Sequence, residues 1–220
     1  MNKSLVKLVI ILSPFLLLII PFYSISFRGT SFSSIVRNRI LLTIFFQRIT
    51  GVMAFIFLFY QIVIGAFIDY LKKHLGEWIL KLHFIFGLAT SIFLIIHPFF
   101  LMIFNYFTRN IIDPFYVFSD ICLLCRNSYE FFLTLGRIAF WLALSMMTAI
   151  VVRKSKGWEL QSRKFHHLNY FIFFLVAIHM RFINVEILRF PLKYFYLFMV
   201  ITVSFIFIFK IGQKFLLKKR

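Results

Sequence analysis

The chain has 220 residues, of which 62% are hydrophobic and 15% are charged, whereas soluble domains average about 45–50% apolar residues. This composition excludes an ordinary soluble domain, and the apolar runs leave no stretch for a separate aqueous domain. The formal net charge is +18, but the basic residues lie in short segments between apolar runs, which indicates membrane topology rather than nucleic-acid binding.

Apolar runs long enough to cross a hydrocarbon core of about 30 Å recur along the chain. They predict one all-α integral membrane domain, a six-transmembrane-helix bundle. The first run contains Pro14 and lacks a small-residue cleavage pattern, so we expect a retained helix rather than a signal peptide. The six predicted spans cover residues 5–25, 40–68, 78–105, 134–152, 165–183 and 192–211.

Lysine is distributed unequally between the two sides of this predicted bundle. The side that holds both termini carries nearly all the lysines, whereas the opposite side carries arginines and only Lys193. By the positive-inside rule, we expect both termini and the loops near Lys72 and Arg153 to lie in the cytoplasm, with the chain in the inner membrane. The basic tail, residues 210–220, suits anionic lipid headgroups. The third and fifth helices then both run outward.

The third helix carries His83 and His97, and the fifth carries His166, His167 and His179. Ionisable residues at membrane depth are costly and point to a function. The step from His83 to His97 corresponds to about 21 Å of rise and nearly four full turns, so the two rings lie on almost the same side of the helix. The step from His166 to His179 gives a similar rise of about 20 Å, but periodicity does not choose between His166 and His167.

Because the two helices run in the same direction, His83 is expected to face His166 or His167 near the cytoplasm, and His97 to face His179 near the outside. Each pair suits the two axial positions of one haem iron. We therefore predict two b-type haems between helices three and five, which favours electron transfer over oxygen or substrate chemistry. Zinc or copper sites are the rival interpretation, but their ligands gather at one point rather than in two layers.

The longest predicted loop, residues 108–133, contains an Asp113-Pro114 turn followed by an apolar segment, which is expected to lie on the outer surface. This segment holds the only cysteines, Cys122 and Cys125. A disulfide is permitted outside the cytoplasm, and we expect an incidental pair or a structural bond, with a redox relay as the alternative. Arg126 rather than histidine follows the pair, so the sequence is not a c-type haem attachment motif.

Several basic residues are candidates for pairing with haem propionates. Arg48 lies inside helix two, Arg137 opens helix four and Arg181 lies near the end of helix five. Arginine at that depth pairs well with carboxylates, and snorkelling to the interface is the alternative. Lys81 and Arg163 are the corresponding candidates for the inner haem.

Four strings carry a resemblance to a known family. They are FFQRITGVMAF in helix two, LHFIFGLATSIFLIIH in helix three, LTLGRIAFWLAL in helix four and KFHHLNYFIFFLVAIH in helix five. They resemble the ferric reductase-like transmembrane superfamily, which includes ferric reductases, the membrane half of NADPH oxidases and the bacterial haem subunit that feeds a periplasmic methionine sulfoxide reductase. The resemblance covers essentially the whole chain, and the short length and basic tail look most like the last of these.

The family pattern Leu-His-x-Leu-x-Tyr opens helix five and matches the string FHHLNY at residues 165–170. The resemblance therefore implies that His166 is the ligand and His167 the alternative. His83 looks more like the corresponding residue of the two-haem oxidases and ferric reductases, because sulfoxide-reductase partners can carry a basic residue there.

The resemblance implies a membrane haem subunit that takes electrons from a cytoplasmic flavoprotein or a membrane quinol and delivers them to an extracytoplasmic acceptor. The sequence has no glycine-rich nucleotide loop and no motif for FMN or quinone, so the donor is expected to be a separate molecule. The first alternative is a ferric reductase or NADPH oxidase-like component with a separate flavoprotein. Two others are a proton-coupled transporter, although no inverted repeat is evident, and an assembly subunit that uses haem only for stability.

Overall fold

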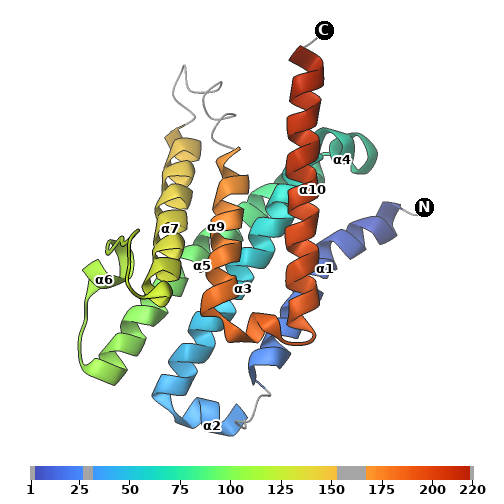
Figure 1. Cartoon of the computed structure of the whole chain (residues 1–220). Coiled ribbons are helices and arrows are strands. Elements are labelled where there is room, and N and C mark those ends of the chain that lie inside the picture. The colour runs from blue at the N-terminus through green and yellow to red at the C-terminus, as the bar shows by residue number, and fades with distance from the viewer. Residues whose placement is uncertain (1–2, 27–31, 153–166, 219–220) are drawn as a thin grey trace.

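The computed structural model describes residues 3–26, 32–152 and 167–218, and in these ranges the regular elements are helices (Figure 1). The elements are α1 (Lys3–Ser26), α2 (Phe32–Arg37), α3 (Arg39–Ala66), α4 (Ile68–Leu75), α5 (Trp78–Arg109), α6 (Pro114–Phe118), α7 (Ser128–Val152), α9 (Leu168–Ile183), the 3-10 helix η1 (Val185–Leu188) and α10 (Leu192–Lys218).

Four helices, α3, α5, α7 and α10, are long and apolar enough to cross a membrane. The apolar parts of α1 and α9 are shorter, at Lys7–Tyr23 and Leu168–Ile183. The 16 residues of α9 extend about 24 Å, which is less than a hydrocarbon core of about 30 Å. In its described ranges the protein is thus all-helical, with four helices of membrane-spanning length, and the six-span bundle stays a prediction.

Helix α3 is the most buried of these four helices. Of its most apolar 18-residue window, 61% is buried inside the protein, against 22% to 33% for the other three. Phe55 of α3 stacks on Phe173 of α9, with ring centroids 4.8 Å apart. Phe57 of α3 stacks on Phe93 of α5 at 5.8 Å. Helix α3 therefore packs against both helices that carry the predicted histidine ligands.

The register between α3 and α5 places each α5 histidine against a glycine of α3. A Cβ atom added to Gly51 would lie 2.9 Å from the His97 ring, and one added to Gly65 would lie 3.0 Å from the His83 ring. The two glycines are as far apart in sequence as the two histidines, and the two helices run in opposite directions. The same register of α3 against α5 therefore determines the positions of both histidine rings, which lie at two levels of the bundle.

The helix ends gather on two sides of the molecule (Figure 1). Helix α4, the last turns of α7 and the end of α10 lie on one side, and α2 and η1 lie on the other. The ammonium of Lys7 in α1 lies 5.1 Å from the Trp78 ring at the start of α5. The ammonium of Lys210 in α10 lies 5.7 Å from the Phe67 ring beside α4. Both terminal helices thus reach the α4 side, while the assignment of that side to the cytoplasm stays a prediction.

Several boundaries differ from the predicted spans. Helix α5 continues to Arg109, and α7 begins at Ser128 rather than at residue 134, so the connecting segment is shorter than predicted. The Asn127 side chain starts α7 early, because its oxygen accepts a hydrogen bond of 2.9 Å from the Tyr129 amide. The short helices α2 and α4 were not predicted, because they lack the apolar length that identified the other helices.

Candidate cofactor site

A cavity lies among α3, α5, α7 and α9, where the predicted outer pair of histidines meets. His97 of α5 and His179 of α9 line it, together with Arg48 of α3 and Arg137 of α7. Most of the other lining side chains are apolar. The structure therefore gathers the two predicted outer ligands and two of the predicted propionate partners around one space.

The two imidazole rings are separated by 6.5 Å between centroids and are nearly perpendicular, with an angle of 88° between their planes. Two imidazoles on opposite sides of one metal ion, with metal–nitrogen bonds of about 2 Å and ring centres about 1.1 Å beyond the nitrogens, would be separated by about 6 Å. The observed separation is therefore close to that of a bis-histidine metal site.

Backbone carbonyl groups of neighbouring helices hold both rings. Nδ1 of His97 lies 2.8 Å from the carbonyl oxygen of Gln47 in α3, and Nδ1 of His179 lies 2.8 Å from the carbonyl oxygen of Phe132 in α7. A carbonyl oxygen only accepts hydrogen bonds, so each Nδ1 carries the proton and each Nε2 keeps its lone pair. Metal-binding histidines almost always donate their second N–H in this way. Both rings are thus in the tautomer that a metal ligand requires.

Two glycines make room for these rings. A Cβ added to Gly51 would lie 2.9 Å from Cε1 of His97, and a Cβ added to Gly136 would lie 2.7 Å from Cε1 of His179. Atoms do not approach so closely, so an alanine at either position would displace the ring. The sequence analysis missed these glycines, although the step from Gly51 to Gly65 equals the step between the two histidines of the facing helix.

Arg137 is only 5% exposed. Since α7 begins earlier than predicted, Arg137 lies inside this helix rather than opening it, and it does not snorkel to the surface. Its Nη1 donates a hydrogen bond to the carbonyl oxygen of Asp120, and its Nη2 lies 3.8 Å from Oε2 of Glu130. This buried Nη2 has no hydrogen-bond acceptor among the residues that the structure describes. A carboxylate of a cofactor would supply such an acceptor.

The other predicted cations occupy different environments. Arg48 is half-buried and lines the cavity. Arg181 is exposed, and its guanidinium lies 5.5 Å from the Phe182 ring rather than at the cavity. Lys81 is exposed on α5. Of the predicted basic residues on the outer side, Arg48 and Arg137 are therefore the ones placed to meet a cofactor.

The predicted inner pair of histidines lies only partly within the described residues. His83 is half-buried on α5 against Gly65. Its predicted partner His166, and the predicted Arg163, lie outside the described residues. The alternative ligand His167 immediately precedes α9 and is exposed. The pairing of His83 with either histidine stays a prediction.

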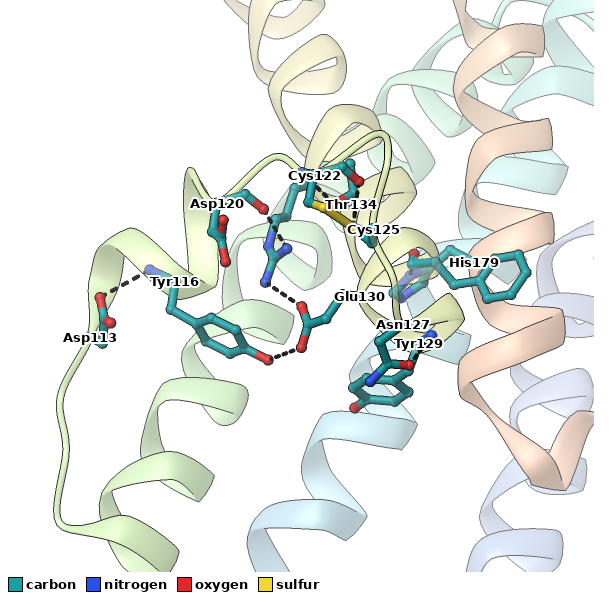
Figure 2. Close-up of polar contacts among 12 residues, drawn as sticks. Asp113, Tyr116, Asp120, Cys122, Cys125, Asn127, Tyr129, Glu130, Thr134 and His179 are labelled. Atoms are coloured by element: carbon teal, nitrogen blue, oxygen red, sulfur yellow. Dashed lines mark hydrogen bonds and ion pairs between the residues drawn. A yellow bond between two sulfur atoms is a disulfide. The ribbon is translucent and has the colours of Figure 1, made fainter.

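The segment between α5 and α7 is attached to the start of α7 by side-chain hydrogen bonds (Figure 2). Asp113 caps α6 by accepting a bond from the Tyr116 amide. The Tyr116 hydroxyl donates to Oε1 of Glu130 at 2.9 Å, and Nε1 of Trp141 donates to the carbonyl of Phe118 at 2.7 Å. Burial and the contact with Glu130 raise the pKa of Tyr116 to about 12, so this phenol keeps its donor proton at neutral pH.

Cys122 and Cys125 form a disulfide in the same segment. The Cys122 amide donates a hydrogen bond of 3.1 Å to Oγ1 of Thr134, which is fully buried on α7. The disulfide permitted by the sequence is therefore present and is anchored to the helix that lines the cavity.

No group of three or more histidine, cysteine or acidic side chains in a metal-binding arrangement occurs within residues 3–26, 32–152 and 167–218. The candidate site in this part of the chain is a pair of histidines. Comparisons with models of protein families, with curated proteins and with solved structures find no match for this chain. The resemblance to the ferric reductase-like superfamily thus stays a prediction from the four sequence strings.

Proposed function

We propose that the chain binds b-type haem between α5 and α9 and carries electrons across a membrane. The observation that carries the proposal is the pair His97 and His179, which face one cavity with both Nδ1 atoms bonded to backbone carbonyls and both Nε2 lone pairs retained. These two histidines would hold the haem iron through their Nε2 atoms, and a bis-histidine haem would suit electron transfer rather than oxygen or substrate chemistry.

The residues around the cavity fit a haem in three ways. The apolar lining suits the macrocycle and excludes water. Gly51 and Gly136 admit the two imidazoles between closely packed helices. Arg48 and Arg137 are placed to pair with propionates, and the buried Nη2 of Arg137 would gain an acceptor. When bound, the haem supplies a one-electron carrier, and these residues hold and orient it.

A second haem would complete the path toward the cytoplasm. His83 would be one ligand, with His166 or His167 as the other, at a level about 21 Å along α5 from His97. In this proposal α1 and α9 complete a six-span bundle in the inner membrane, with both termini in the cytoplasm. The basic stretch of sequence at residues 153–164 would attract an acidic flavoprotein donor, and a membrane quinol is the alternative donor.

The acceptor in this proposal is an extracytoplasmic protein, for which a periplasmic reductase such as a methionine sulfoxide reductase is the family-based candidate. The second candidate is a ferric reductase or NADPH oxidase-like component that works with a separate flavoprotein. The placement of His83 against Gly65 favours this second candidate, because it repeats at the inner level the arrangement of His97 against Gly51.

The absorption spectrum and haem content of the purified protein test the proposal. We expect a reducible haem b spectrum in the native chain and loss of the outer haem in His97→Ala and His179→Ala. His74→Ala is the matched control, because His74 also bonds a carbonyl through Nδ1 but is exposed on α4. A chain without haem after expression with haem supplied, or equal haem content in all three variants, would overturn the proposal.

A further inference from the structure

We propose that the Cys122–Cys125 disulfide is redox-active: it accepts electrons from the outer haem site and passes them to a disulfide of an extracytoplasmic protein. The proposal rests on the haem site proposed at His97 and His179, and it identifies the first acceptor beyond that site. It also states the class of partner, a protein whose own cysteines are oxidised.

Two hydrogen bonds connect His179 to the disulfide across about half a turn of α7, from Phe132 to Thr134. Nδ1 of His179 donates to the carbonyl oxygen of Phe132 at 2.8 Å, and two residues later Oγ1 of Thr134 accepts from the Cys122 amide at 3.1 Å. Figure 2 shows Thr134 beside the disulfide, with His179 on the neighbouring helix. We call this path from His179 through Phe132 and Thr134 to Cys122 the bridge. It crosses a single helix, whose diameter with side chains is about 10 Å. The disulfide therefore lies about one helix away from a proposed axial ligand.

A second attachment holds the disulfide segment against the cavity wall. Nη1 of Arg137 donates to the carbonyl oxygen of Asp120, two residues before Cys122. The same arginine is buried and lines the cavity. Hydrogen bonds at Asp120 and Cys122 thus attach the segment to α7, through Arg137, which lines the cavity, and Thr134, which does not.

Stabilisation of the fold is a weak reason for this disulfide. Only two residues lie between the cysteines, so the bond closes a very short loop and removes little freedom from the unfolded chain. Three hydrogen bonds already attach the segment to α7: Thr134 accepts one, and Arg137 and Trp141 each donate one. The cysteine pair also has the two-residue spacing of thiol–disulfide oxidoreductases.

The disulfide lies where another protein can reach it. Both cysteines are partly exposed. The residues between them, Leu123 and Leu124, are 61% and 99% exposed, and Ile121 is 50% exposed. Exposed disulfides are generally the labile or catalytic ones, and exposed apolar side chains around one provide contacts for a docking partner. The disulfide is therefore partly accessible at the surface of the chain, next to exposed apolar side chains.

The proposed reaction has two stages, reduction of the Cys122–Cys125 disulfide and exchange with a partner disulfide. The disulfide takes up two electrons, in two successive transfers by way of His179, together with two protons from water, and the S–S bond breaks to give two thiols. A reduced haem held by His97 and His179 would supply these two electrons. One thiolate then attacks the partner disulfide to form a mixed disulfide. The other cysteine of the pair breaks that bond, which restores Cys122–Cys125 and leaves two thiols on the partner.

Thiol counting under anaerobic conditions tests the proposal on the haem-loaded protein. A photoreduced flavin supplies single electrons, haem reduction is followed by absorbance, and free thiols are counted by intact mass after maleimide labelling. In the native chain, two thiols should appear after the haem is reduced. In His97→Ala, which removes the outer haem, the cysteines should stay disulfide-bonded.

A pair of threonine variants tests the bridge itself. Thr134→Val removes the acceptor for the Cys122 amide while keeping the side-chain shape, and thiols should then appear at least severalfold more slowly. Thr148→Val makes the same change near the other end of α7, where the hydroxyl bonds only its own helix, and should leave the rate unchanged. If Thr134→Val does not fold, the comparison of the native chain with His97→Ala still decides the proposal.

The failures of the two proposals are distinguishable. Full haem reduction with no thiols would overturn the redox disulfide and leave the haem site standing. Thiols that appear equally fast in His97→Ala would show reduction by the reagent and would also overturn it. An equal rate in Thr134→Val would overturn the bridge through α7. A chain that binds no haem would overturn both proposals, because the reductant of the disulfide would be missing.

Discussion

His97 and His179 differ from the other histidines of the described chain in their surroundings. His74 also places Nδ1 on a carbonyl oxygen, but that carbonyl belongs to its own helix, and the side chain is exposed. His97 and His179 bond carbonyls of neighbouring helices, 50 and 47 residues away in sequence, and both line the cavity. The spacing in the sequence predicted the pairing of these two residues, but no local pattern predicts a hydrogen bond between helices. The tautomers therefore follow only from the contacts that each ring makes in the folded chain.

Gly136→Ala tests the fit of the His179 ring. Alanine normally stabilises a helix by about 1 kcal/mol relative to glycine, but here the new Cβ would lie 2.7 Å from two atoms of the ring. We expect the ring to move and haem affinity at the outer site to fall by about 10- to 100-fold, the range for changes in residues that support metal ligands. Haem titration of the apoprotein measures this change.

Gly212→Ala is the control for this variant. Gly212 lies in α10, and a Cβ added there has nothing within 4 Å. Its haem affinity should equal that of the native chain. If Gly136→Ala bound haem as tightly as Gly212→Ala, His179 would not be held as the structure places it, and its role as a ligand would be in doubt.

Among the elements, α3 sets the positions of both α5 histidines although it carries no predicted ligand. Its Gly51 and Gly65 receive the His97 and His83 rings, and its Gln47 carbonyl orients the first of them. Hydropathy predicted all the long helices, because each has a long apolar run. It did not predict α2 and α4, which are short, or the early start of α7, which depends on the Asn127 cap.

Gly65→Ala tests whether the same register builds an inner haem site. The added Cβ would lie 3.0 Å from Cε1 of His83, a somewhat looser contact than at Gly136. We expect this variant to lose the inner haem and keep the outer one, so that haem content falls from two per chain to one. Pyridine haemochrome analysis, normalised to protein, gives the count. An unchanged content of two haems would contradict the proposal that the contact of His83 with Gly65 builds an inner haem site.

At the scale of the whole molecule, the arrangement of helices separates the two ends of the proposed electron path, and its outward direction stays a prediction from the distribution of lysine. Both terminal helices reach the α4 side, while the six spans stay a prediction. The segment between α5 and α7 lies beside the start of α7, away from that side (Figure 1). The lining of the cavity includes Leu133, Gly136 and Arg137 of the same helix. Sequence analysis predicted this separation from the distribution of lysine and the spacing of the histidines. It did not predict that the cysteine segment is attached to the cavity wall, because that contact joins residues brought together only by folding.

Electron transfer across a sealed bilayer tests the central proposal most directly. Proteoliposomes with the α4 side inward would enclose a reductant that does not cross membranes, and ferricyanide outside would report arriving electrons. The native chain and His74→Ala should reduce ferricyanide, whereas His97→Ala should fall to the rate of vesicles without protein. Reduction by His97→Ala at the native rate would contradict the proposal that electrons leave the membrane through the haem held by His97 and His179.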